Sequence, residues 1–91
     1  MNEELKANLI RLGAKKWQSA DKKHTRIYLN SNAQLEVLGA KITSTPKYSG
    51  ETSGIGSKTK IFWNEEKELF ECETGSLKNT ITELGYKAAR I

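Results

Sequence analysis

The chain has 91 residues, of which 36% are hydrophobic, and a formal net charge of +4. This length supports a single domain with a small core, and no apolar run approaches the roughly 18 residues of a membrane-spanning helix. The one cysteine excludes an internal disulfide, and the acidic, polar first residues are unlike a secretory signal. We therefore expect one domain over residues 1–91 in the cytoplasm, with no membrane partner.

The phrase Leu-Gly-x-Lys occurs three times, at residues 12–15, 38–41 and 84–87. Before two of these copies, apolar residues recur at i, i+4 and i+7, which is one stripe of a short amphipathic helix. Glycine after the last apolar residue suits the left-handed end of a helix, and the lysine lies near the negative end of the helix dipole. The phrase therefore predicts where helices stop, and the helices are expected at 2–12, about 32–38 and 77–84.

Strands are predicted between these helices by the alternation of apolar and polar residues. Ile27 and Leu29 alternate with Arg26 and Tyr28, as in a strand with one buried face. Polar turns at 20–23 and 64–67 indicate two hairpins. The predicted strands are 15–19, 25–29, 40–45, 60–63 and 69–73, and residues 86–91 form either a short closing strand or a frayed end.

The segment 46–59 is rich in Gly, Ser, Thr and Lys, with Tyr48 and Ile55 as its only sizeable apolar residues. A loop of this length in a small domain is usually functional or disordered. We expect a flexible loop here. The whole is expected to be α+β: an antiparallel sheet of about four to six strands, with two main helices on one face and a third short helix.

Positive charge is concentrated in the first two thirds of the chain. Residues 1–60 hold eleven Lys and Arg against five Asp and Glu, a balance of +6, whereas residues 61–91 hold four against six, a balance of −2. Basic residues also lie among aromatic ones on the first hairpin, and nucleic-acid binding uses cations for phosphates and rings for bases. The alternative is that the aromatic residues belong to the core. The candidate contacts here are Lys15, Lys16, Trp17, Lys22, Lys23, Arg26 and Tyr28.

The glycine-rich stretch 50–59 has a brief likeness to a phosphate-binding P-loop. A serine separates Gly56 from Lys58, however, and a strand is predicted next, where a P-loop requires a helix. Spacing and context therefore argue against nucleotide hydrolysis. The same stretch suits contacts with a phosphate backbone through Lys47, Lys58 and Lys60, the alternative being a solvated loop.

The sequence offers no set of residues typical of catalysis. His24 is the only histidine and Cys72 the only cysteine, so the three or four Cys and His ligands of a zinc site are missing. Glu71 and Glu73 flank Cys72 and disfavour its thiolate, which predicts a buried structural thiol. We expect no catalytic residue, no metal and no cofactor, and a protein that is not an enzyme.

Part of the chain resembles the small HicA-type mRNA-cleaving toxins. The resemblance rests on the first helix, a strand with the lone His24 among basic residues, further strands, and a last helix that opens at Gly75-Ser76-Leu77. Residues 30–60 have no counterpart in it. The resemblance implies a fold like that of double-stranded-RNA-binding domains, with His24 as the acid/base of a ribonuclease.

These observations favour a non-enzymatic, small basic binding protein that acts on a nucleic acid or on a nucleic-acid-handling protein complex. Such proteins are common among phage and mobile-element genes, so the specific role we expect is inhibition of host defence, as by anti-CRISPR proteins. Two alternatives stay open. One is the ribonuclease with His24; the other is a protein-interaction module that binds no nucleic acid and uses a patch around Trp63 and the hairpin glutamates.

Overall fold

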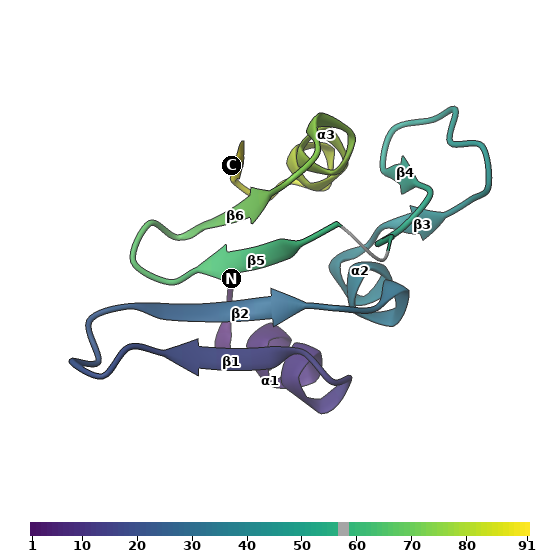
Figure 1. The fold of residues 1–91 in the computed structure, drawn as a ribbon. Coiled ribbons are helices and arrows are strands. Elements are labelled where there is room, and N and C mark those ends of the chain that lie inside the picture. The colour runs from purple at the N-terminus through teal and green to yellow at the C-terminus, as the bar shows by residue number, and fades with distance from the viewer. Residues whose placement is uncertain (57–58) are drawn as a thin grey trace.

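A computed structural model describes residues 1–56 and 59–91, and Figure 1 shows their arrangement. None of the helices in these residues is long and apolar enough to cross a membrane. In chain order the elements are α1 (Glu3–Arg11), β1 (Lys15–Gln18), β2 (Thr25–Leu29), α2 (Asn32–Leu38), β3 (Lys41–Ile42), β4 (Glu51–Thr52), β5 (Ile61–Asn64), β6 (Leu69–Cys72), α3 (Gly75–Glu83) and β7 (Ala88–Arg90).

The helices stop at the repeated glycines, and two of them start at side-chain caps. Asn2 Oδ1 accepts a hydrogen bond from the Leu5 amide at 2.7 Å, and Thr74 Oγ1 accepts one from the Leu77 amide at 3.2 Å, which satisfies amides of the first turn. The glycine of each Leu-Gly-x-Lys phrase is left-handed, with φ of +98°, +108° and +98° at positions 13, 39 and 85. The prediction that this phrase ends helices is confirmed.

The main sheet has five strands in the order β1-β2-β5-β6-β7. Its first three pairs are antiparallel, and the α+β class predicted from the sequence is confirmed. The last pair differs from the expected antiparallel sheet, because β7 runs parallel to β6. The physical reason is the connection: α3 packs against both strands and carries the chain back, as a helix does between parallel strands.

A second, two-stranded sheet lies inside the region predicted as strand 40–45 and loop 46–59. There β3 and β4 pair in parallel, and Thr52 of β4 is buried. Thr80 of α3 donates a hydrogen bond to the Glu51 carbonyl at 3.2 Å, which ties β4 to the helix. Tyr48, expected as an apolar anchor, is 76% exposed. The first part of this segment is therefore held by backbone pairing and by α3, with no contribution from Tyr48 to the core.

One face of the main sheet carries the core and the helices. Alternation places the odd residues of β2 and β5 and the even residues of β6 on this face, where the chain buries its apolar side chains. Each helix contributes one buried stripe. The core residues are Leu9, Ala14, Ile27, Leu29, Leu35, Leu38, Ala40, Ile61, Trp63, Phe70, Cys72, Leu77 and Ile81.

Candidate nucleic-acid interface

None of the described strand residues that belong to the core lies on the opposite face of the main sheet. In the register of β1 and β2, Lys15 lies beside Tyr28 and Trp17 beside Arg26. Their direct neighbours along each strand, such as Ile27, point to the helices, so these four side chains point the other way. Two aromatic rings and two cations predicted as contacts thus share one face, which we call the open face.

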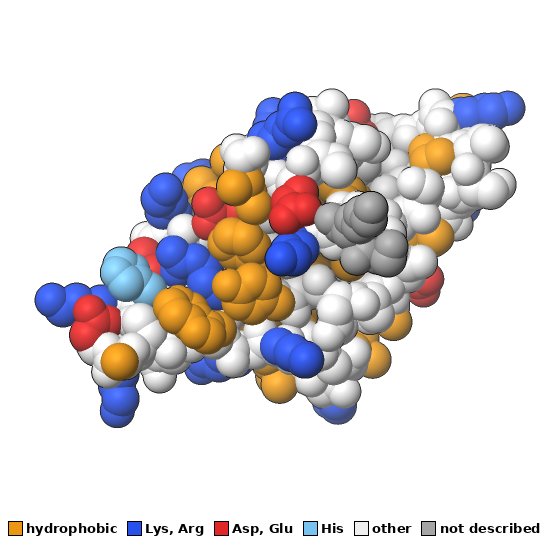
Figure 2. All heavy atoms as spheres, in the orientation of Figure 1, with side chains coloured by type: hydrophobic (Ala, Val, Ile, Leu, Met, Phe, Trp, Pro, Cys, Tyr) orange, Lys and Arg blue, Asp and Glu red, His pale blue; other side chains and the backbone are white. Residues whose placement is uncertain are grey.

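Aromatic rings form the centre of the open face. Trp17 is 48% exposed and Tyr28 36% exposed, so neither belongs to the core. Phe62 lies beside Tyr28 across β2 and β5, with ring centroids 5.2 Å apart. Figure 2 shows hydrophobic side chains gathered in the middle of this face with Lys and Arg side chains around them. Phe62 was not among the predicted contacts. The sequence alone does not show which of the two neighbouring rings, Phe62 or Trp63, is buried; the pairing of β5 with β2 decides it.

Basic and acidic side chains lie on different parts of the open face. Lys15 and Lys60 lie on its β1–β2–β5 side and are exposed. Glu71 of β6 lies beside Phe62, and Glu73 lies opposite Lys60, because its amide donates to the Lys60 carbonyl at 3.2 Å and continues the pairing. A bound polyanion is therefore favoured along β1, β2 and the start of β5 and disfavoured over β6.

A cavity of about 340 Å³ opens at one end of the open face. Lys15, Tyr28 and Lys60 line it, together with Ile55 and Asn30. The Asn30 side chain is already engaged: its Nδ2 donates to the Gly13 carbonyl at 3.1 Å and its Oδ1 accepts from Gln34 at 2.8 Å. The cavity therefore presents two lysine ammonium groups, the Tyr28 ring and the aliphatic Ile55 side chain to a ligand. The Asn30 side-chain amide is already hydrogen-bonded within the protein.

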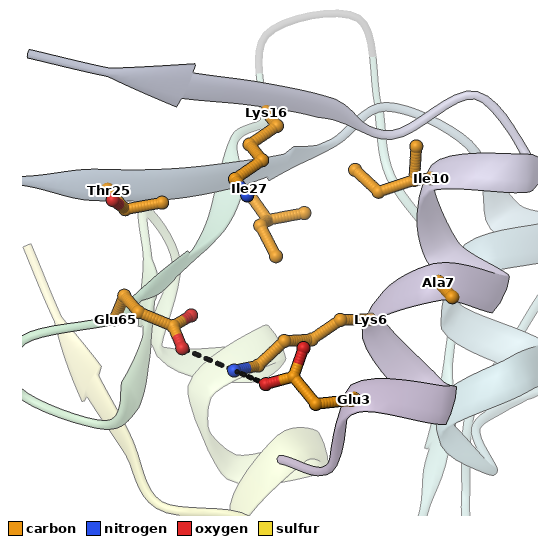
Figure 3. Close-up of a pocket in the computed structure, with 8 residues that line it drawn as sticks. All are labelled: Glu3, Lys6, Ala7, Ile10, Lys16, Thr25, Ile27 and Glu65. Atoms are coloured by element: carbon orange, nitrogen blue, oxygen red, sulfur yellow. Dashed lines mark hydrogen bonds and ion pairs between the residues drawn. The ribbon is translucent and has the colours of Figure 1, made fainter.

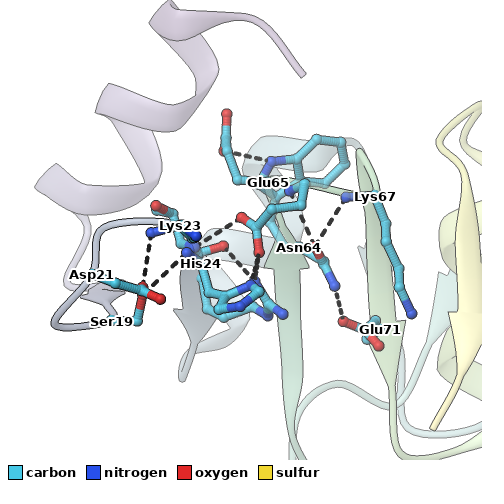
Figure 4. Close-up of polar contacts among 12 residues, drawn as sticks. Ser19, Asp21, Lys23, His24, Asn64, Glu65, Lys67 and Glu71 are labelled. Carbon is cyan, nitrogen blue, oxygen red and sulfur yellow. Dashed lines mark hydrogen bonds and ion pairs between the residues drawn. The ribbon is translucent and has the colours of Figure 1, made fainter.

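Glu66, in the turn between β5 and β6, joins the two hairpins. Its carboxylate accepts hydrogen bonds from the Thr25 amide at 2.8 Å and from Arg26, and lies 3.0 Å from Nδ1 of His24, which is labelled in Figure 4. The Thr25 amide, followed by the Arg26 guanidinium, lowers the pKa of Glu66 to about 2. Arg26 is thus partly neutralised by a partner within the protein, and it supplies less charge to a ligand than Lys15 does.

The tip of the first hairpin carries Lys22 and Lys23, both exposed. Asp21 accepts hydrogen bonds from Ser19 and from the Lys23 amide, and the first of these contributes most to a lowered pKa of Asp21. The turn is therefore shaped by Asp21, and the two lysines project at the far end of the hairpin from the cavity.

Lys16 lies on the other face of the sheet. With Ile10, Ile27 and Lys6 it lines a second cavity, of about 350 Å³, between α1 and the first hairpin (Figure 3). The Lys6 ammonium group donates hydrogen bonds to the carboxylates of Glu65 and Glu3, the second at 3.1 Å. The hydrogen bond to Glu65 is the main cause of the raised pKa of Lys6. Lys16 therefore cannot contact the same short ligand as Lys15.

The loop lysines are dispersed. Lys47 lies in the connection between β3 and β4, outside the five-stranded sheet, where its amide donates to Glu51 at 2.9 Å and its side chain is exposed. Lys58 lies outside the described residues. Of Lys47 and Lys60, the two of these lysines that the structure describes, Lys60 is the one placed with the aromatic rings.

Two residues considered for other roles belong to the core. Trp63 is 3% exposed, packs edge-on against Phe70 at 5.0 Å, and donates to Glu65 at 2.8 Å. The Trp63 ring is therefore not an exposed member of the interaction patch expected around Trp63 and the hairpin glutamates. Cys72 is fully buried, and burial raises its pKa to about 11, so the predicted structural thiol is confirmed. Over residues 1–56 and 59–91, no three His, Cys, Asp or Glu side chains are grouped to hold a metal ion.

Comparison with known proteins adds no relative to this description. No protein-family model, curated protein or solved structure matches the chain. The functional argument therefore rests on the open face and its chemistry.

Proposed function

We propose that this protein is a non-catalytic binding protein for single-stranded nucleic acid, and that the strand lies on the open face. The observation that carries the proposal is the exposure of Trp17 and Tyr28 beside Lys15 on the sheet face opposite the core. Aromatic rings on such a surface stack on bases, and neighbouring lysines neutralise phosphates.

Single strands fit this face better than duplexes because stacking requires an accessible base face. A duplex offers its phosphates to lysines but hides its bases between neighbouring pairs. The acidic residues Glu71 and Glu73 also limit the positively charged part of the face to the area of β1, β2 and the start of β5, which leaves less surface for the two backbones of a duplex. The side-chain amide nearest the cavity, that of Asn30, is held within the protein, which favours binding with little sequence preference.

The test is fluorescence anisotropy with labelled single-stranded RNA and DNA and the matching duplexes, at about 50 mM and about 200 mM salt. If the two lysines of the open face, Lys15 and Lys60, contact phosphates, a slope of about −0.7 per contact predicts a roughly 7-fold loss of affinity over this range. Tighter binding of the single strands supports the proposal. Absence of binding at the lower salt, or equal binding of duplexes, contradicts it, and absence directs attention to a protein partner. Inhibition of a host defence complex stays a separate prediction for a partner assay.

A further inference from the structure

The cavity at the end of the open face differs from the rest of that face because it is concave and has cations on two sides. Lys15 of β1 lines one side of it, and Lys60, which directly precedes β5, lines the other. Tyr28 lies between them on β2. Within the described part of the chain, no carboxylate lies within ion-pair distance of either lysine. Neither ammonium group is held in an ion pair, and Lys15 is the freer of the two because Glu73 lies opposite Lys60 where the β5–β6 pairing continues.

We propose that this cavity is a mononucleotide subsite. It holds one nucleotide, with the base against Tyr28 and Ile55 and the phosphate between Lys15 and Lys60. This inference rests on the proposed function, since the nucleotide would be one unit of the bound strand.

Size and chemistry support this ligand. A volume of about 340 Å³ is near the lower end of the usual range for small-molecule sites, about 300 to 1,000 Å³, so it suits one nucleotide and not two. The lining combines an aromatic ring and an aliphatic side chain, which bind a base through stacking and apolar contact, with two ammonium groups for phosphate. Because Asn30 Nδ2 and Oδ1 are both bonded within the protein, the site distinguishes nucleotide from nucleoside more strongly than one base from another.

The test is titration of the ¹⁵N-labelled full chain with uridine 5′-monophosphate, followed by amide chemical shifts, with uridine and inorganic phosphate as separate probes. The expected result is saturable shifts at Tyr28, Ile55 and Lys60, with uridine and phosphate each at least tenfold weaker. The double variant K15Q/K60Q should lose at least tenfold in affinity for the nucleotide. The matched double variant K22Q/K23Q, with the same change in charge, should stay within twofold of the wild type.

Equal losses in the two double variants, or shifts that do not saturate, would overturn the subsite. The proposed function is judged separately by the oligonucleotide titration. If oligonucleotides bind in a Trp17-dependent manner while uridine 5′-monophosphate does not saturate, the subsite is wrong and the interface stands. If single-stranded oligonucleotides do not bind at all, the proposed function fails whatever the mononucleotide does.

Discussion

Glu66 and Thr25 connect the two hairpins of the sheet: the Thr25 amide at the start of β2 donates to the Glu66 carboxylate at 2.8 Å, across the gap to the β5–β6 turn. The same carboxylate binds Arg26. This contact fixes the end of the open face that lies away from the cavity. It also sets how much of the positive charge of β2 is left for a ligand.

The first prediction concerns pH. The pKa of Glu66 is lowered to about 2 in the folded chain, so its contribution to stability is full above its unfolded pKa and is lost as pH falls toward 2. In E66Q this contribution is absent, and the variant should lose less stability than the wild type over that acid range. Urea unfolding followed by circular dichroism at several pH values measures this. E68Q, an exposed neighbour in the same turn, is the control, and equal pH profiles for E66Q and the wild type would contradict the assignment.

The second prediction concerns stacking. Trp17 is exposed and Trp63 is buried, so a bound base should quench Trp17 fluorescence and leave Trp63 emission nearly unchanged. W17A should lose roughly 5- to 150-fold in affinity for a single strand, since a base stacked on an aromatic ring contributes about 1 to 3 kcal/mol. Its stability should change little, as for most surface substitutions, within about 0.5 kcal/mol. Unchanged affinity in W17A would remove this ring from the interface.

The third prediction concerns the acidic half of the open face. The double variant E71Q/E73Q removes negative charge next to Phe62, while the new side-chain amide oxygen at position 71 can still accept the hydrogen bond that Asn64 donates, 2.7 Å long in the wild type. Affinity for single strands should rise about two- to fivefold at low salt, and the gain should shrink at high salt because screening weakens it. The control is E4Q, on the first turn of α1. A fall in affinity for E71Q/E73Q would contradict the proposed path of the strand.

The fourth prediction separates binding from cleavage. His24 is exposed, with Nδ1 3.0 Å from the Glu66 carboxylate, at the end of the hairpin away from the cavity. We expect the wild type to leave labelled RNA intact, and H24A to bind RNA within twofold of the wild type. RNA cleavage by the wild type that disappears in H24A, with the fold retained, would establish the ribonuclease alternative.

The fifth prediction concerns the segment that leads to the cavity. Gly54 has φ +98°, and a Cβ there would collide with the Asn32 side chain, whose Oδ1 accepts the Ile55 amide at 2.8 Å. G54A should therefore destabilise the fold by more than the about 1 to 2 kcal/mol that the left-handed conformation costs alanine by itself. Gly75 has open space around it in the first turn of α3, so G75A should be neutral or stabilising by up to about 1 kcal/mol. Thermal unfolding compares them, and equal midpoints would contradict the packing around Gly54.

Local features of the sequence predicted most of the elements. The glycines of the repeated phrase need a left-handed backbone whatever surrounds them, and alternation marks the buried side of β2 without knowledge of its neighbours. The basic and aromatic residues of the first hairpin were likewise identifiable, because both strands are close in sequence and pair through a short turn. That pairing alone places Lys15, Trp17 and Tyr28 together.

Only the tertiary structure decided which other residues join them. The pairing of β2 with β5 places Phe62 beside Tyr28 and brings Lys60 to the same cavity as Lys15, although the two lysines are far apart in the chain. It also places Glu66 on Arg26, and the packing of α1 decides that the face of Lys16, and not that of Lys15, is the one covered by a helix. Such contacts depend on strand order and register, which are set by how the helices and strands share one buried core. No local propensity encodes that choice.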